Sequence, residues 1–167
     1  MNLFIDMDGV IVKYNTDDYV ARPDSVPLYL TKHYFENLEE DIRIVEYLNT
    51  LQNDSNDITF YILSRIPDAR MCGPETFADI VESKMNWLKY HCTLNFDVKN
   101  IILTPYSKCE AAKRVLKRPL CSSDILVDDF NNNLIEWRAA GGVAFKYVNG
   151  LNSAETAPCL YFGFGSK

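Results

Sequence analysis

The sequence predicts an α/β fold, in which a doubly wound, mostly parallel sheet of the Rossmann-like kind carries helices on both faces. Short apolar runs alternate along the chain with longer amphipathic stretches. The apolar runs are continuous rather than interrupted at every second residue, as expected of strands that are covered on both faces. A length of 167 residues suggests one domain, spanning 1–167, with room for a sizeable core.

Five stretches are predicted as strands. Each is a short run of β-branched, aromatic or aliphatic residues bounded by polar or turn-forming residues. The first, NLFID, opens the chain, and the last, VAFKYV, follows a pair of glycines. The predicted strand ranges are 2–6, 58–63, 100–104, 124–129 and 143–148.

Amphipathic spacing predicts four helices between these strands. In the first, apolar residues recur three and four positions apart from Leu38 to Leu51. Pro119 stops the third helix, and Gly141 provides a C-terminal stop for the fourth. The predicted helix ranges are 37–52, 75–91, 108–118 and 132–141.

Residues 10–36 are irregular and rich in tyrosine, and we expect them to form a loop or a small cap insertion. Residues 64–74 are expected to form a loop, and the tail 150–167 receives no assignment. The aromatic residues of the irregular segment either form a wall that stacks on a base or line the apolar underside of the cap. They are Tyr14, Tyr19, Tyr29, Tyr34 and Phe35.

The composition limits the classes of partner. The net charge of −6 argues against stable binding to a nucleic-acid backbone, which needs a basic surface. No apolar stretch approaches the roughly 18 residues of a membrane span, so no membrane partner is expected. The five cysteines have no metal-ligand spacing and are read as reduced, buried residues of a cytoplasmic protein. His33 and His91 are interpreted as ordinary residues, and Trp87 and Trp137 as core residues.

Chemically competent side chains follow the ends of the predicted strands. Asp6 and Asp8 follow the first, Ser64 the second, Lys108 the third, and Asp128 with Asp129 ends the fourth. In such sheets, ligands bind beyond the carboxyl ends of the strands. Several carboxylates in one small site need a positive counter-charge, and all-oxygen ligands with open positions suit Mg²⁺.

A phosphoryl group fits the same set of residues. Lys108 supplies a positive charge and Ser64 a hydroxyl donor, while Arg65 is either a phosphate contact or a solvated side chain. One carboxylate could attack phosphorus to form an aspartyl-phosphate. A second carboxylate, two residues further on, could protonate the leaving oxygen and then activate water.

Four stretches, FIDMDGVIV, YILS, TPYSK and LVDDFNNNL, resemble the four motifs of the haloacid dehalogenase-like (HAD) hydrolase superfamily. They occur in the superfamily's order and span residues 3–148. The stretches KMNWLKYH and LVDDFNNNLIEWRAAGGVAFKYVNG are more narrowly similar to the branch of cytosolic-type 5′-nucleotidases, deoxy (pyrimidine), and its bacterial and phage relatives.

The resemblance implies a role for each matching residue. Asp6 is the expected nucleophile, and Asp8 the general acid and base, whose backbone carbonyl also reaches the metal. Ser64 and Lys108 are expected to bind the phosphoryl group. The metal set is Asp6, Asp8, Asp128 and Asp129, with Asp129 favoured over Asp128 as the direct ligand. The branch often carries a larger cap than residues 10–36 provide. This departure bears on which substrate is bound more than on the catalytic reaction.

The function expected from these observations is a Mg²⁺-dependent phosphomonoesterase acting on nucleoside monophosphates. Three alternatives stay open: a phosphatase for another small ester or a phosphorylated macromolecule, a phosphotransferase or mutase with the same intermediate, and a catalytically silent binding module. The expected partner is a small phosphorylated substrate, and a homodimer is left open.

Overall fold

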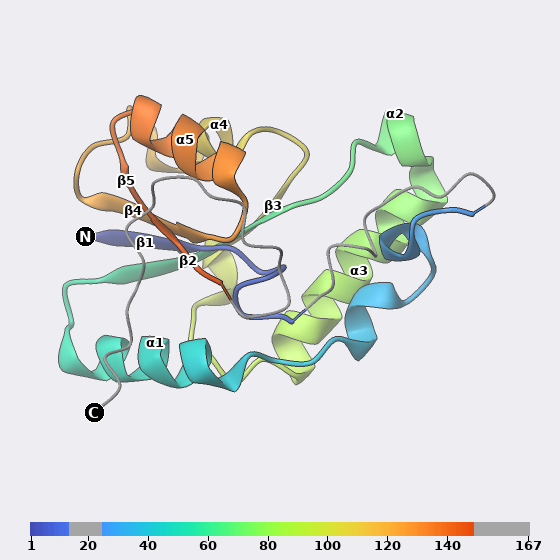
Figure 1. Ribbon diagram of the computed structural model, residues 1–167, viewed down its shortest axis with the longest axis horizontal. Coiled ribbons are helices and arrows are strands. Elements are labelled where there is room, and N and C mark those ends of the chain that lie inside the picture. The colour runs from blue at the N-terminus through green and yellow to red at the C-terminus, as the bar shows by residue number, and fades with distance from the viewer. Residues whose placement is uncertain (14–24, 149–167) are drawn as a thin grey trace.

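The computed structural model in Figure 1 describes residues 1–13 and 25–148. Within them, one parallel sheet has five strands in the order β3-β2-β1-β4-β5. The predicted α/β class with a parallel sheet is therefore confirmed. The strands are β1 (Asn2–Ile5), β2 (Thr59–Arg65), β3 (Ile101–Thr104), β4 (Asp124–Asp128) and β5 (Val143–Lys146).

Helices cover both faces of this sheet. Figure 1 shows α4 and α5 together on one face and α1 on the other. A long helix, α3, runs from beneath the sheet to a separate lobe at its side, next to the short α2. The α-helices are α1 (Ile42–Asp54), α2 (Ala69–Cys72), α3 (Pro74–Tyr90), α4 (Lys108–Leu116) and α5 (Asn131–Ala139).

Two differences from the predicted boundaries bear on the site. The first helix begins at Ile42 rather than at residue 37, because residues 34–37 form a 3₁₀ turn, η3 (Tyr34–Asn37), that buries Phe35. The second strand continues through Ser64 and Arg65, which were expected to begin a loop. Both residues pair with β3 and are therefore held by the sheet.

The core has a layer on each side of the sheet. On the α1 side, Ile5 and Ile62 pack with Leu48 of α1 and Trp87 of α3. On the other side, Phe4, Leu63 and Leu126 pack with α4 and with Leu134 and Trp137 of α5. The prediction that Trp87 and Trp137 are core residues is confirmed, since neither is exposed.

The cysteines do not all follow the prediction that they are buried. Cys109 is buried and Cys72 and Cys92 are half-buried, but Cys121 is exposed, so that prediction is wrong for Cys121. It lies in the turn before β4, where its backbone N–H donates to Asp124 Oδ2 at 2.9 Å and its Sγ lies 3.1 Å from Ser123 Oγ. Cys159 lies outside the described residues.

A small third cluster builds the lobe beside the sheet. We call residues 25–38 the cap segment; it contains η2 (Leu28–Leu30) and η3. Phe35 packs there with Ile80 of α3 and with Ile66, which follows β2. The predicted insertion, 10–36, also includes residues 14–24, which lie outside the described residues, as do Tyr14, Tyr19 and the tail.

None of the helices in the described ranges has the length and apolar character that crossing a bilayer requires.

Candidate active site

The site lies at the carboxyl edge of the sheet, where β1 and β4 end side by side. Ile5 is paired with Val127, and the backbone N–H of Asp6 extends the ladder by donating to the carbonyl of Val127 at 2.9 Å. Asp6 therefore leaves β1 next to Asp128, the last residue of β4. The strand pairing, which the apolar runs impose, is what brings these two acids together.

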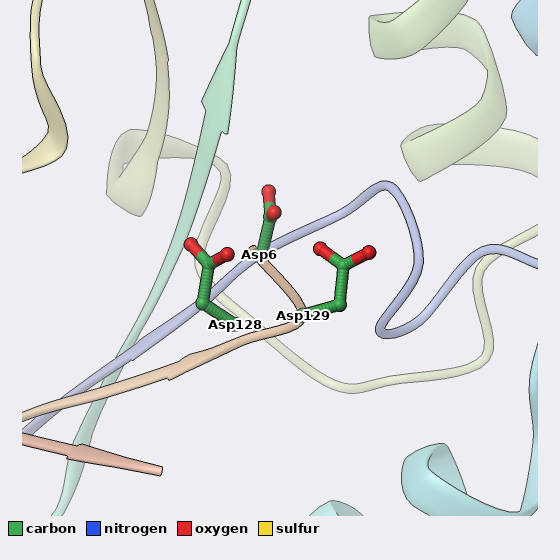
Figure 2. A group of neighbouring side chains, drawn as sticks. All are labelled: Asp6, Asp128 and Asp129. Carbon is green, nitrogen blue, oxygen red and sulfur yellow. The ribbon is translucent and has the colours of Figure 1, made fainter. Parts of the chain in front are cut away.

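Three carboxylates gather at this edge. One carboxylate oxygen from each of Asp6, Asp128 and Asp129 lies within 4.8 Å of the others. Figure 2 shows their side chains turned toward the same side of the chain. Asp6 is 6% exposed and Asp128 is fully buried. A set of oxygen donors at this spacing fits a hard divalent cation such as Mg²⁺.

Lys108 is the positive charge built into the group. It is the first residue of α4 and is 1% exposed. Its Nζ lies 2.7 Å from Asp6 Oδ1 and 2.6 Å from Asp128 Oδ2. Burial alone would lower the pKa of Lys108, but the carboxylates of Asp128 and Asp6 outweigh it and raise that pKa. Lys108 therefore stays protonated at neutral pH.

Asp128 is fixed by the protein through both of its oxygens. The backbone N–H of Phe130 donates to Oδ1 at 2.8 Å. The Nδ2 of Asn133 lies 3.2 Å from Oδ1 and 3.0 Å from Oδ2, and Lys108 also donates to Oδ2 at 2.6 Å. This network makes Asp128 a rigid anchor for Lys108; that Asp129 is the more direct metal ligand stays a prediction.

The raised pKa of Asp6 indicates that the site lacks enough positive charge to keep its carboxylates ionised. Burial is the main reason that its pKa is raised well above the usual value, and repulsion from Asp128, Asp129 and Asp8 adds to it, while Lys108 acts in the opposite direction. A divalent cation would favour the ionised form, because an opposite charge close by lowers a carboxyl pKa. The donor set and the electrostatics of Asp6 therefore both fit a metal ion.

The second part of the site surrounds Asp8. Gly9 has a positive φ of 80°, which a residue without a side chain adopts readily and which turns the chain just after Asp8. The carboxylate of Asp8 does not belong to the group of three. Its Oδ2 instead accepts a hydrogen bond from the Nζ of Lys84, which also lies 2.8 Å from Ser64 Oγ.

A pocket of about 280 Å³ opens beside Asp8. Tyr29 and Phe35 of the cap segment contribute aromatic walls, and Arg65 brings an exposed cation from the end of β2. Tyr34 instead packs edge-on against Phe35, with ring centroids 5.0 Å apart. The full lining is Asp8, Tyr29, Phe35, Arg65, Ile66, Pro67 and Lys84.

The predicted site residues thus fall into two adjoining groups. Asp6, Lys108, Asp128 and Asp129 form one, and Asp8, Ser64 and Arg65 line or adjoin the pocket. The roles given to them, including Asp8 as a metal ligand through its carbonyl, stay predictions. His33 and His91 are both exposed and outside these groups.

Sequence reasoning missed Lys84 and Asn133. Lys84 is buried on α3 together with Ile80, Trp87 and Leu88, so it occupies a position of the helix's apolar stripe. A lysine at such a position is the signal that could have found it. Asn133 stands in a run of three asparagines, and nothing in the run itself distinguishes the one that reaches Asp128.

Only the comparison with solved structures finds proteins similar to this chain, and it supports the fold. No protein-family model matches the sequence, and no curated protein matches it significantly. Among solved structures, the D,D-heptose 1,7-bisphosphate phosphatase of B. bronchiseptica, complexed with magnesium and phosphate, is similar at 14% identity and a TM-score of 0.54, covering 87% of this chain and 80% of its own.

Two other structures are similar to the same extent. A HAD family enzyme from Bacteroides thetaiotaomicron, complexed with magnesium and inorganic phosphate, has 12% identity and a TM-score of 0.55, covering 92% of this chain and 96% of its own. The HAD domain of an effector protein from Legionella pneumophila, an inactive mutant, has 15% identity and a TM-score of 0.53, covering 91% and 87%. The chain therefore has the fold of the HAD-family structures.

Proposed function

We propose that this protein is a Mg²⁺-dependent phosphomonoesterase that forms an aspartyl-phosphate on Asp6, and that its substrates are nucleoside monophosphates. The observation that carries the proposal is the buried group at the ends of β1 and β4. There Lys108 bridges Asp6 and Asp128 at 2.7 Å and 2.6 Å, with Asp129 beside them. Two requirements of phosphoryl transfer, a carboxylate nucleophile and nearby positive charge, meet at Asp6.

Each residue has a defined task in this mechanism. Asp6 attacks phosphorus and forms a bond to it while the bond to the leaving oxygen breaks. Lys108 offsets the negative charge of Asp6 and of the phosphoryl group, and Ser64 donates its hydroxyl to a phosphoryl oxygen. Mg²⁺ held by Asp129 and Asp6, with Asp128 nearby, would supply charge neutralisation and orient the phosphoryl oxygens.

Asp8 handles the proton. It gives a proton to the leaving oxygen in the first step and takes one from the attacking water in the second, so that the aspartyl-phosphate is hydrolysed and Asp8 is restored. Its place on the wall of the 280 Å³ pocket supports this role, because the leaving group of the substrate would occupy that pocket.

The pocket also supports a ring-bearing leaving group. Tyr29 offers an aromatic ring on which a nucleobase can stack, and Arg65 offers hydrogen-bond donors. The resemblance of KMNWLKYH and LVDDFNNNLIEWRAAGGVAFKYVNG to the 5′-nucleotidase branch favours the same class. The heptose bisphosphate phosphatase acts on a different ester, so a sugar phosphate is the competing small substrate.

The test is phosphate release from a panel of esters, with Mg²⁺ and with a chelator. The panel holds ribo- and deoxyribonucleoside monophosphates, sugar phosphates, a phosphopeptide and a 5′-phosphorylated oligonucleotide. We expect release that depends on Mg²⁺ and prefers nucleoside monophosphates. Preference for another small ester would overturn the substrate class, and release only from the peptide or oligonucleotide would point to a macromolecular substrate.

Asp6→Asn keeps the volume of the side chain and removes the nucleophile, so it should abolish release. Asp54→Asn changes an exposed aspartate at the end of α1 and serves as the matched control. No release by the wild-type protein from any ester would favour a binding module. A cytoplasmic location and a homodimer belong to the same proposal and are tested by fractionation and by light scattering.

A further inference from the structure

Lys84 is a buried cation that no step of the proposed mechanism uses. It is 1% exposed and lies near the middle of α3 (Pro74–Tyr90). Ahead of it, Ile80 packs with Phe35 of the cap segment; behind it, Trp87 packs in the main core. Lysine is almost never fully buried unless its charge is paired, which makes its partners informative.

The ammonium group of Lys84 has three acceptors within hydrogen-bond distance. They are Asp8 Oδ2, Ser64 Oγ at 2.8 Å and the carbonyl oxygen of Arg65 at 3.2 Å. An ammonium group has three N–H donors and no acceptor, so these three contacts use its full capacity. The ring of Phe35 lies 4.3 Å from Nζ and closes the site on the cap side.

These contacts decide what Ser64 and Asp8 have left to offer. Because Ser64 Oγ accepts from Lys84, its own O–H is available as a donor. Asp8 Oδ2 accepts from Lys84, whereas Oδ1 is buried and has no hydrogen-bond partner among the described residues, so the contact with Lys84 fixes the orientation of the Asp8 carboxylate.

We propose that Lys84 is a positioning residue of the catalytic reaction. By holding Asp8 Oδ2 and the accepting side of Ser64, it fixes the orientation in which the Asp8 carboxylate meets the leaving oxygen and directs the Ser64 hydroxyl to the phosphoryl group. This inference rests on the proposed phosphatase function, since it assigns a task within that mechanism. It also links the cap segment, through Phe35, to the residue that handles the proton.

The competing explanation is that Lys84 only ties α3 to the ends of β1 and β2. Both explanations predict a less stable protein when the ion pair is removed, so stability does not separate them. They differ in how the loss of activity depends on the ester. A positioned proton donor matters most for a poor leaving group, and little for one that departs as a stable anion.

The experiment compares benzyl phosphate with 4-nitrophenyl phosphate in the presence of Mg²⁺. Both esters carry one ring, but benzyl alkoxide needs a proton to leave and 4-nitrophenolate does not. Lys84→Met should lower kcat on benzyl phosphate by about 10²-fold or more, the usual contribution of a general acid, and lower it by less than about tenfold on 4-nitrophenyl phosphate. Lys89→Met, an exposed lysine on the same helix, should match the wild-type protein on both esters.

Asp8→Asn provides the second arm. If Lys84 acts through Asp8, the double variant should show the same preference for 4-nitrophenyl phosphate as Asp8→Asn alone, because two residues that act as a unit are not additive. Where Lys84→Met fails to fold, judged by its circular dichroism, Lys84→Arg replaces it: the planar guanidinium does not reproduce the three contacts of the ammonium group, so the same selective loss is expected.

The outcomes distinguish a failure of the proposed phosphatase function from a failure of the positioning role of Lys84. No turnover of either ester by the wild-type protein overturns the proposed function, and the role of Lys84 falls with it. An active wild-type protein whose folded Lys84 variant loses equal activity on both esters overturns only the positioning role. A selective loss on benzyl phosphate, reproduced by Asp8→Asn, supports both.

Discussion

Replacing Lys108 by methionine should reveal how strongly the buried charges at the site depend on it. The substitution keeps the length of the side chain and removes the ammonium group that lies 2.7 Å from Asp6 and 2.6 Å from Asp128. Both carboxylates are then left in a buried site without their cation. Breaking a buried ion pair on one side costs about 3–5 kcal/mol, and we expect the free energy of unfolding at neutral pH, without metal, to fall by that amount.

Urea denaturation provides the measurement. The two buried tryptophans, Trp87 and Trp137, report unfolding from opposite faces of the sheet. Lys99→Met is the matched control, because Lys99 also lies 2.7 Å from an aspartate, Asp97, but is 78% exposed. Such an exposed pair contributes little to stability, because water screens it. A loss below about 1 kcal/mol for Lys108→Met would refute the reasoning, since the two pairs would then be energetically alike.

Three further predictions concern the metal, the ion pair of Asp124 at the start of β4 and one glycine. Asp129→Ala should lose activity together with its dependence on Mg²⁺; an active variant indifferent to chelator would contradict the metal assignment. Burial would raise the pKa of Asp124, but hydrogen bonds from Arg118, Asn2 and Cys121 lower it below the usual 3.8. Asp124 therefore stabilises the fold above that pH and ceases to do so as the pH falls below it. Asp124→Asn should cost about 1–3 kcal/mol at neutral pH, toward the lower end because Arg118 is 39% exposed and water screens it, and the difference should shrink below about pH 4 in urea titrations; a constant difference would count against the ion pair. A Cβ at Gly142 would lie 2.3 Å from Trp137 Nε1, so Gly142→Ala should cost about 1–3 kcal/mol, and an unchanged thermal midpoint would contradict that packing.

Much of the fold follows from local pattern. The apolar runs predict the strands of the described residues because strands covered on both faces need apolar side chains on both. The start of the first helix was not predictable in the same way. Leu38 fits the helical spacing, but residues 34–37 form a 3₁₀ turn that buries Phe35, and Leu38 follows it in extended backbone, where its carbonyl accepts from the Trp87 indole N–H at 2.8 Å.

The site residues also differ in whether a local sequence pattern could predict them. Asp6, Ser64, Lys108 and Asp128 could be found because each stands at a strand end or directly after a loop. Lys84 and Asn133 lie within helices, and their partners are distant in the sequence or hidden in a repeat: Lys84 is 76 residues from Asp8. Only the packing of α3 against the edge of the sheet brings that pair together, and a single sequence does not encode such packing in any local pattern.

The central claim, that Asp6 carries the phosphoryl group, is tested most directly by mass spectrometry of the acid-quenched protein. The protein is mixed with Mg²⁺ and 4-nitrophenyl phosphate, quenched, digested and mapped; Asp8→Asn is included because slower hydrolysis should let the intermediate accumulate. We expect one added phosphoryl group on the peptide with Asp6, and none in Asp6→Asn. Turnover by the wild-type protein and Asp8→Asn with no modified peptide, or with the phosphoryl group on another residue, would contradict it.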